Sequence, residues 1–172
     1  MTARECVNEN GFAIIRDVLP GQDIRRVLSD FENATLRRNR AGGGHAWDSA
    51  RFARFSRNSQ LLAIAGETLG EAAFAFRVTL FDKSSAANWL VVWRQGTALP
   101  IQQRNETPGW GPWSVKERVI YAHACAGALS PVLALRVHLD DSRADRGPLR
   151  VLPATNNCGV LDDETCTCWP PG

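Results

Sequence analysis

Apolar residues in the first half of the chain recur with the period of an α-helix. After a turn at Pro20 and Gly21, four apolar side chains spaced at i, i+3, i+4 and i+7 predict a helix that buries one stripe. A second apolar run predicts a helix over residues 59–69, with Asn58 or Ser59 as its N-cap and Gly70 as its stop. The first stripe consists of Ile24, Val27, Leu28 and Phe31.

Other apolar runs have the two-residue period or the short length of β-strands. Residues 11–15 predict a buried strand, and apolar alternation over residues 74–80 predicts another. Glycine and proline predict loops at 37–47 and 97–116. Further strands are predicted at 89–94, 118–124, 132–140 and 149–152. Helices followed by antiparallel strands predict an α+β chain, mainly β in its core, with a barrel or jelly-roll architecture.

Composition is that of one globular domain over residues 1–172. The chain has 172 residues, of which 44% are hydrophobic and 22% charged, and this is enough for one core of ordinary size. The chain has 20 basic and 18 acidic residues. Because its net charge is only +2, we expect no nucleic-acid partner. No apolar run has the length of a membrane span, and the N-terminus lacks the apolar core of a signal peptide. We therefore expect a soluble, cytoplasmic protein with no membrane partner.

Several segments, in order, resemble one protein family. They are GFAIIRDVL near the start, LFDKSSAANW with the Trp-Arg-Gln-Gly run that follows, ETPGWGPWSVK, and LALRVHLDDSRADRGPLRVLP. Their order and spacing resemble the phytanoyl-CoA dioxygenase family of Fe(II)- and 2-oxoglutarate-dependent oxygenases over residues 11–159. The resemblance implies a double-stranded β-helix of the jelly-roll or cupin type with N-terminal helices, followed by an irregular tail at 160–172.

The resemblance also locates the positions at which the family binds iron. Family enzymes hold Fe(II) with a His-x-Asp pair and a second histidine, and the open positions receive 2-oxoglutarate and dioxygen. Here the pair falls on Arg94 and Gly96. Arginine has no lone pair to give, glycine has no side chain, and a guanidinium repels a cation. The distal histidine and its arginine would follow the last residue, so we expect a chain that lacks the last strands and binds neither metal nor cofactor.

Two nearby side chains are candidates for binding a carboxylate. By the resemblance, Gln95 keeps the middle of the ligand motif and Arg136 lines the central pocket, where they would bind a 2-oxoglutarate-like small organic acid. The alternatives are an ion pair between Arg136 and Asp140, and a solvent-facing Gln95. His138 and Asp140 form another His-x-Asp pair, but the family carries a similar pair beside its separate ligands. We therefore interpret it as a polar strand end.

The cysteines suggest one further site. Their number is odd and three crowd the end of the chain, which predicts free thiols in a reducing compartment. Cys158, Cys166 and Cys168 could bind zinc together with His123 or His45, but they lack the paired CxxC spacing of convincing zinc sites. The favoured interpretation is a tail with incidental thiols. The six tryptophans predict either an aromatic-lined pocket or core packing.

Three functional hypotheses follow. The favoured one is an inactive relative of the oxygenases, or pseudoenzyme. The second is a noncatalytic module that binds a small molecule or assembles with itself, because a β-helix without its terminal strands exposes edges that pair with another copy. The third is an active 2-oxoglutarate-dependent enzyme with non-standard ligands. Some related halogenases carry glycine in place of the carboxylate, but Arg94 argues against this hypothesis because the histidine is replaced as well.

Overall fold

The described residues belong to two compact units. The computed structural model describes residues 1–32, 38–39, 42–43, 50–81, 93–116, 118–141 and 148–161. Unit 1 combines residues 1–90 with 133–154, and unit 2 combines 91–132 with 155–172. The single domain expected over the whole chain stays a prediction. No helix in these described ranges is long and apolar enough to cross a membrane.

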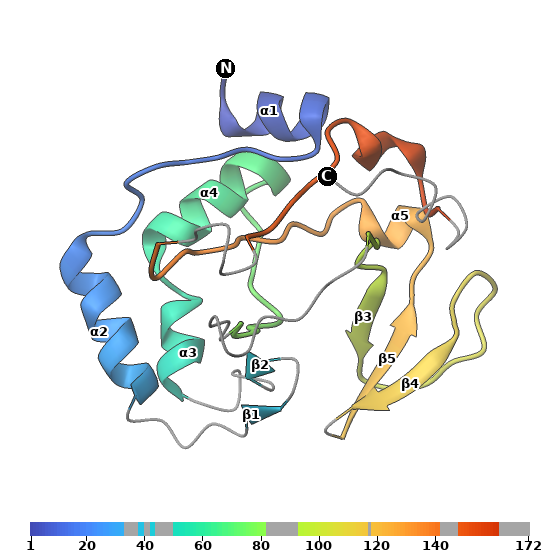
Figure 1. The fold of residues 1–172 in the computed structure, drawn as a ribbon. Coiled ribbons are helices and arrows are strands. Elements are labelled where there is room, and N and C mark those ends of the chain that lie inside the picture. Colours follow the sequence, from blue (N-terminus) through green and yellow to red (C-terminus); the bar gives the residue numbers. More distant parts are fainter. Residues whose placement is uncertain are drawn as a thin grey trace. The chain divides into compact units, whose positions relative to one another are not determined.

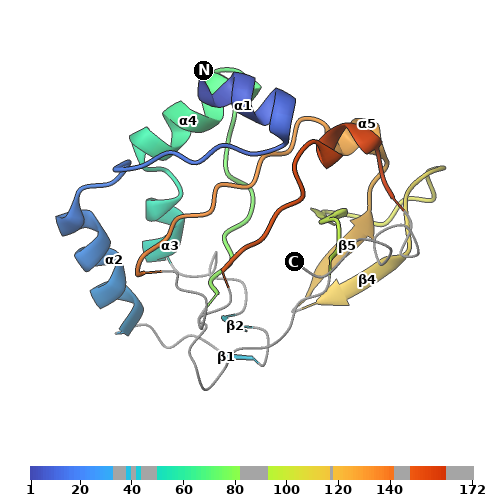
Figure 2. The ribbon, with the colours of Figure 1, turned by 45° about the horizontal axis from the view of Figure 1, so that its top comes forward.

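Helices dominate the described part of unit 1 (Figure 1). They are α1 (Ala3–Asn10), α2 (Gly21–Glu32), α3 (Ala50–Phe55) and α4 (Ser59–Leu69). The helices α2 and α4 confirm the two that apolar spacing predicted. α1 packs against α4, as both Figure 1 and Figure 2 show. Among the described residues of this unit, three apolar side chains are buried, one each from α2, α3 and α4: Val27, Phe52 and Leu61.

The ends of α4 are fixed by the residues that the sequence suggested. The side-chain oxygen of Asn58 accepts hydrogen bonds from the backbone N–H groups of Gln60 and Leu61, at 2.9 and 3.3 Å. At the other end, the N–H of Gly70 donates to the carbonyl of Gly66 at 2.8 Å. Asn58 is therefore the N-cap, Ser59 is the first helical residue, and Gly70 ends the helix.

Removal of this cap should destabilise unit 1 measurably. Replacing Asn58 with alanine leaves two helix N–H groups without their side-chain acceptor, so we expect the free energy of unfolding to fall by about 1 kcal/mol. The measurement is chemical denaturation followed by circular dichroism. Gln60→Ala, on the same turn and exposed, is the matched control and should have almost no effect. Equal stability of both variants would contradict the cap.

The helix α1 was not predicted, although the sequence contains a signal for it. Thr2 and Glu5 form a capping box, in which the threonine side chain accepts from the N–H of Glu5 at 3.2 Å and the glutamate accepts from the N–H of Thr2 at 2.7 Å. Gly11 ends the helix in the left-handed region at φ 80°, and its N–H donates to the carbonyl of Val7. Thr-x-x-Glu followed by glycine six residues later identifies this helix from the sequence.

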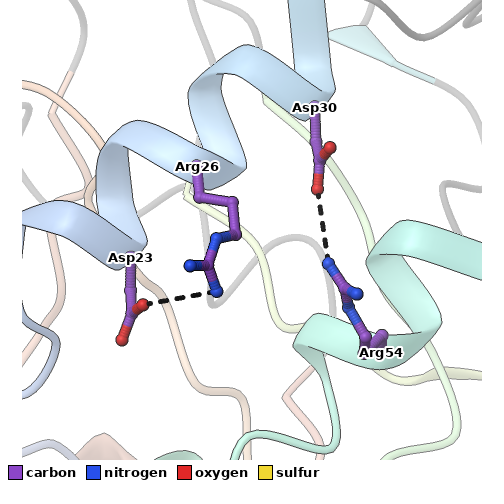
Figure 3. Close-up of polar contacts among 4 residues, drawn as sticks. All are labelled: Asp23, Arg26, Asp30 and Arg54. Atoms are coloured by element: carbon purple, nitrogen blue, oxygen red, sulfur yellow. Dashed lines mark ion pairs between the residues drawn. The ribbon is translucent and has the colours of Figure 1, made fainter.

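Between described residues of unit 1, two ion pairs lie on the surface (Figure 3). Arg54 of α3 lies 3.8 Å from Asp30 of α2, and Arg26 lies 3.9 Å from Asp23 within α2. Both arginine side chains are largely exposed, at 73% and 69%. Pairs of this kind contribute little because water screens them and long side chains lose freedom when ordered. Apolar burial, not these pairs, holds the helices together.

Several strand predictions in unit 1 were wrong. Residues 11–15, 132–140 and 149–152 form no strand, and residues 74–80 contribute only an isolated bridge at Thr79. These stretches are drawn as plain coil in Figure 1. Ile14 and Phe74 are 77% and 78% exposed, so apolar alternation did not mark a buried face. Alternation identifies a chain that suits a strand, but a strand also needs a partner for its N–H and C=O groups.

Unit 2 contains a three-stranded antiparallel sheet. Its strands are β3 (Ala98–Ile101), β4 (Trp113–Lys116) and β5 (Val119–His123), in the order β3-β5-β4. β5 confirms the strand predicted at 118–124. Its residue Ala122 is fully buried and lies between Leu99 of β3 and Trp113 of β4 in the register. The short helices α5 (Ala126–Leu129) and η3 (Thr155–Cys158) complete the described elements.

The predicted loop at 97–116 is wrong, because it contains both outer strands of this sheet. Pro100 misled the prediction, since proline lacks the N–H that a central strand needs. The N–H of Ala124 donates to the carbonyl of Thr97 at 3.0 Å, so residues 97 and 124 are a hydrogen-bonded pair. Along β3, every second residue is then hydrogen-bonded to β5 and the residues between them are not. Pro100, opposite Tyr121, then occupies a position that makes no bond to β5. Proline at this position of an edge strand costs no hydrogen bond.

The remaining predictions lie partly outside the described residues. Residues 38–39 and 42–43 form the short pair β1 (Arg38–Asn39) and β2 (Gly42–Gly43) inside the predicted loop at 37–47, which was wrong there. Of the strand predicted at 89–94, residues 89–92 lie outside the description, and residues 93 and 94 are not in a strand. The three-stranded sheet of the described residues does not confirm a double-stranded β-helix.

Candidate functional site

The segment that enters β3 carries the two positions that the resemblance assigned to iron ligands. Arg94 is exposed, and so is Gly96. A Cβ atom built on Gly96 would meet no heavy atom of the described residues within 4 Å, and this glycine does not use the left-handed region that L side chains avoid. The space beside Gly96 therefore accommodates a side chain, and what this position lacks is a donor atom.

The residues at these two positions do not fit a divalent iron. The guanidinium of Arg94 keeps its charge and offers no lone pair, and Gly96 offers no side-chain atom at all. In the described ranges, no three histidine, cysteine, aspartate or glutamate side chains gather closely enough to hold a metal ion. The chemistry of the donor set at positions 94 and 96 is the argument against iron binding there.

Gln95, between these two positions, bonds to a distant piece of main chain. Its side-chain amide donates to the carbonyl of Gly159 at 2.8 Å, and its oxygen accepts from the N–H of Leu161 at 2.7 Å. One carboxamide thus satisfies both a main-chain acceptor and a main-chain donor of the segment that follows Thr155–Cys158. The predicted contact of Gln95 with a carboxylate ligand stays a prediction.

Thr97 and His123 form a short polar contact in unit 2. The hydroxyl of Thr97 lies 2.7 Å from Nδ1 of His123, and Thr97 is only 9% exposed. The two residues are brought together by the β3–β5 pairing, in which His123 is opposite Ala98. When the hydroxyl donates to Nδ1, the ring proton lies on Nε2, on the far side of the imidazole from Thr97.

An open hollow of about 310 Å³ lies beside this pair. It is bounded by the end of β5, by the turn before β4 and by Val160, and most of its wall is apolar. Its side chains with reactive or hydrogen-bonding groups are His123, Cys125 and Thr97. The lining residues are Thr97, Gly109, Gly111, Pro112, His123, Ala124, Cys125, Ala126 and Val160. A small molecule with an apolar body and one polar group suits such a wall.

Sequence reasoning missed this hollow, although it named His123 as a partner for zinc. His123 and Cys125 are two residues apart at the end of a predicted strand, so the two-residue period places them on one face. That signal was available. The contributions of Thr97 and Val160 to the hollow could not be predicted, because no local pattern links residues 26 or more positions apart in the sequence.

The other predicted carboxylate ligand belongs to unit 1. Arg136 is exposed, and its guanidinium carbon lies 5.8 Å from the centre of the Phe81 ring, a cation–π distance. His138 and Asp140, the second His-x-Asp pair, are also exposed and lie outside any strand. Gln95 belongs to unit 2. The pairing of Gln95 and Arg136 around one carboxylate therefore stays a prediction, as does the ion pair between Arg136 and Asp140.

The cysteines that the structure describes are free. Cys6 is half-buried on α1, and Cys125 and Cys158 are exposed. Cys166 and Cys168, which completed the zinc hypothesis, lie outside the described residues, as does His45. Of the tryptophans, Trp113 is half-buried, with the Arg104 guanidinium 5.5 Å from its ring centre.

Comparison with known proteins identifies the family. The family model for phytanoyl-CoA dioxygenase matches residues 7–169, nearly the whole chain. The chain belongs to the phytanoyl-CoA dioxygenase family. This confirms the resemblance found in the sequence and implies a cupin-like fold. No curated protein and no solved structure gives a match to the chain.

Proposed function

We propose that this chain is a phytanoyl-CoA dioxygenase-like protein that does not bind Fe(II) at the family's ligand positions and does not turn over 2-oxoglutarate. The observation that carries the proposal is the pair Arg94 and Gly96, which supplies a permanent cation and no donor atom. The double-stranded β-helix expected from the resemblance is part of the proposal, supported by a family match that spans both units.

Electrostatics strengthens the argument beyond the loss of ligands. A histidine lost from an iron site leaves a weaker site, but an arginine in its place adds a positive charge beside the metal. The repulsion between the two charges increases as water is excluded from the surroundings. Replacement of the carboxylate alone can be tolerated in an iron enzyme when another anion takes its place. When both ligands are replaced, one of them by a cation, an added anion does not restore the iron site.

The direct test is an assay of the reaction that defines the family. Purified protein is incubated with Fe(II), 2-oxoglutarate and ascorbate, and succinate is measured. We expect no succinate beyond that formed without protein, while a catalytically competent member of the family produces it under the same conditions. Protein-dependent succinate would overturn the proposal and would support an active enzyme with non-standard ligands.

A second candidate function is supported by the hollow in unit 2. In a noncatalytic small-molecule-binding protein, the apolar wall would contact the body of the ligand, and Nε2–H of His123 would donate to one carboxylate oxygen. A small organic acid has this chemistry. Titration of the iron-free protein with 2-oxoglutarate or succinate, followed through the His123 ring signals by NMR, tests this function separately from turnover.

A further inference from the structure

Gln95 attaches one short segment of unit 2 to the chain that enters β3. The segment is Gly159–Leu161, which follows η3 and which we name the strap. Both of its hydrogen bonds to Gln95 are short, 2.8 Å from the amide to the Gly159 carbonyl and 2.7 Å from the Leu161 N–H to the amide oxygen. Between these two bonded residues lies Val160, which forms part of the wall of the hollow. The two hydrogen bonds of Gln95 thus hold Val160, and with it one wall of the hollow, in place.

The local backbone shows why the strap can be held at this point. Gly159 has φ +71°, in the left-handed region that side chains with a Cβ rarely adopt, so the chain turns there after η3. Among the described residues, no atom lies within 4 Å of a Cβ built on Gly159, so the backbone angle alone favours glycine there. Val160 is 49% exposed, which means that its own burial contributes modestly. The two bonds of Gln95, together with the partial burial of Leu161, are therefore the described attachments of the strap.

We propose that the Gly159–Leu161 strap is a movable wall of the hollow beside His123 and Cys125, and that the Gln95 carboxamide is the latch that keeps it closed. Release of the two hydrogen bonds frees Val160 and widens access to the imidazole and the thiol. Each bond of this kind changes an opening equilibrium by a factor of roughly two to ten, so the closed form dominates while brief opening stays accessible. The device does not depend on iron binding or on turnover.

The first test measures the latch itself. Gln95→Ala removes both hydrogen bonds, and Gln95→Glu keeps an acceptor for the Leu161 N–H but loses the donor for the Gly159 carbonyl. We expect hydrogen exchange of the Leu161 amide, followed by NMR, to accelerate about tenfold in the alanine variant, because two net hydrogen bonds are lost. The glutamate variant should be intermediate. Gln103→Ala, an exposed glutamine of the same unit, should exchange like the wild type.

The second test measures access to the hollow. Cys125 is already exposed, so a small alkylating reagent should label it at nearly the same rate in all variants. A bulky maleimide needs more room, and its reaction with Cys125 should be several times faster in Gln95→Ala than in wild type or Gln103→Ala. Peptide mass spectrometry assigns the label to each cysteine. Cys6, which belongs to unit 1, and the Tyr121 amide of β5 serve as controls for general unfolding.

Every outcome decides the proposal. Faster Leu161 exchange together with faster bulky labelling of Cys125, at unchanged Cys6 labelling and Tyr121 exchange, supports it. Unchanged Leu161 exchange overturns the latch, and faster exchange without a change at Cys125 overturns the link between strap and hollow. Parallel acceleration at Cys6 or Tyr121 shows that the substitution loosens the fold in general, and this also overturns the proposal. None of these readouts depends on enzymatic activity, so failure here leaves the proposed function untouched.

Discussion

Replacing Arg94 with histidine and Gly96 with aspartate together is expected to create a metal site at two positions whose native side chains supply no donor atom. Cobalt(II) is a convenient probe, because its absorption changes when nitrogen and oxygen ligands bind. The affinity for Co(II) should increase by at least about tenfold over wild type, since even the outer-shell partners of metal ligands are worth about 10- to 100-fold. The gain has two sources, the added donor atoms and the removal of the Arg94 charge.

The structure makes this double substitution suitable as a test. In the part of the chain that the structure describes, an aspartate at position 96 meets no neighbouring atom within 4 Å of its Cβ, and it needs no unusual backbone angle. The change therefore adds a ligand without a steric penalty there. Each single variant adds only one donor and should bind much more weakly. A matched control places the same two residues elsewhere on unit 2, as Gln103→His with Asn105→Asp in the exposed loop after β3. Equal binding by control and double variant would show that position 94–96 offers no special geometry.

Substitution of Ala122 by aspartate is expected to have the largest effect on stability. Ala122 is completely buried in the central strand β5, between two neighbouring strands. A carboxylate there has no room and no described charge partner, and burial of an unpaired polar group ranks among the most destabilising changes known. We expect a loss of about 3 kcal/mol or more, a large part of the 5–15 kcal/mol that typically separates folded from unfolded domains.

The measurement is thermal unfolding of the full chain, followed by circular dichroism. Ser114→Asp introduces the same charge at an exposed position of the adjacent strand β4 and should unfold nearly like the wild type. If both variants unfold at the same temperature, Ala122 is not the centre of the sheet. If the Tyr121 amide stays protected from hydrogen exchange in Ala122→Asp, this would likewise contradict a central position of Ala122 in the sheet.

The helices α2 and α4 were predictable because their signals are local. Val27 and Leu61 lie on stripes that repeat every three to four residues, and Asn58 and Gly70 mark the ends of α4 through atoms a few positions away. The strands were less predictable. Exposed Phe74 belongs to a sequence that alternates like a strand, whereas Pro100 lies in a strand that its own sequence disfavours. In both cases, whether the segment forms a strand depends on a partner segment, and alternation alone does not identify that partner.

The same distinction applies to the candidate site. The absence of ligand chemistry at Arg94 and Gly96 is a property of the residues themselves, so the sequence was sufficient once the family motif had been aligned. The engagement of Gln95 with Leu161 joins positions 66 residues apart, and the bond between Thr97 and His123 joins positions 26 apart. Contacts of that range follow from the strand register of unit 2 and from the course of its last described segment. Neither is encoded in a short motif.

The proline in β3 has a consequence for how this sheet meets other molecules. Because Pro100 makes no bond to β5, its nitrogen faces the outer side of the strand, where it presents a ring carbon instead of a donor. A foreign strand approaching that side finds a gap in the hydrogen-bonding pattern and a steric obstacle. On the opposite side, the main-chain groups of Trp113 and Val115 point outward from β4, and the Val115 side chain is 69% exposed. Of the two borders of the described sheet, that of β4 is therefore the one where an added strand would meet no proline.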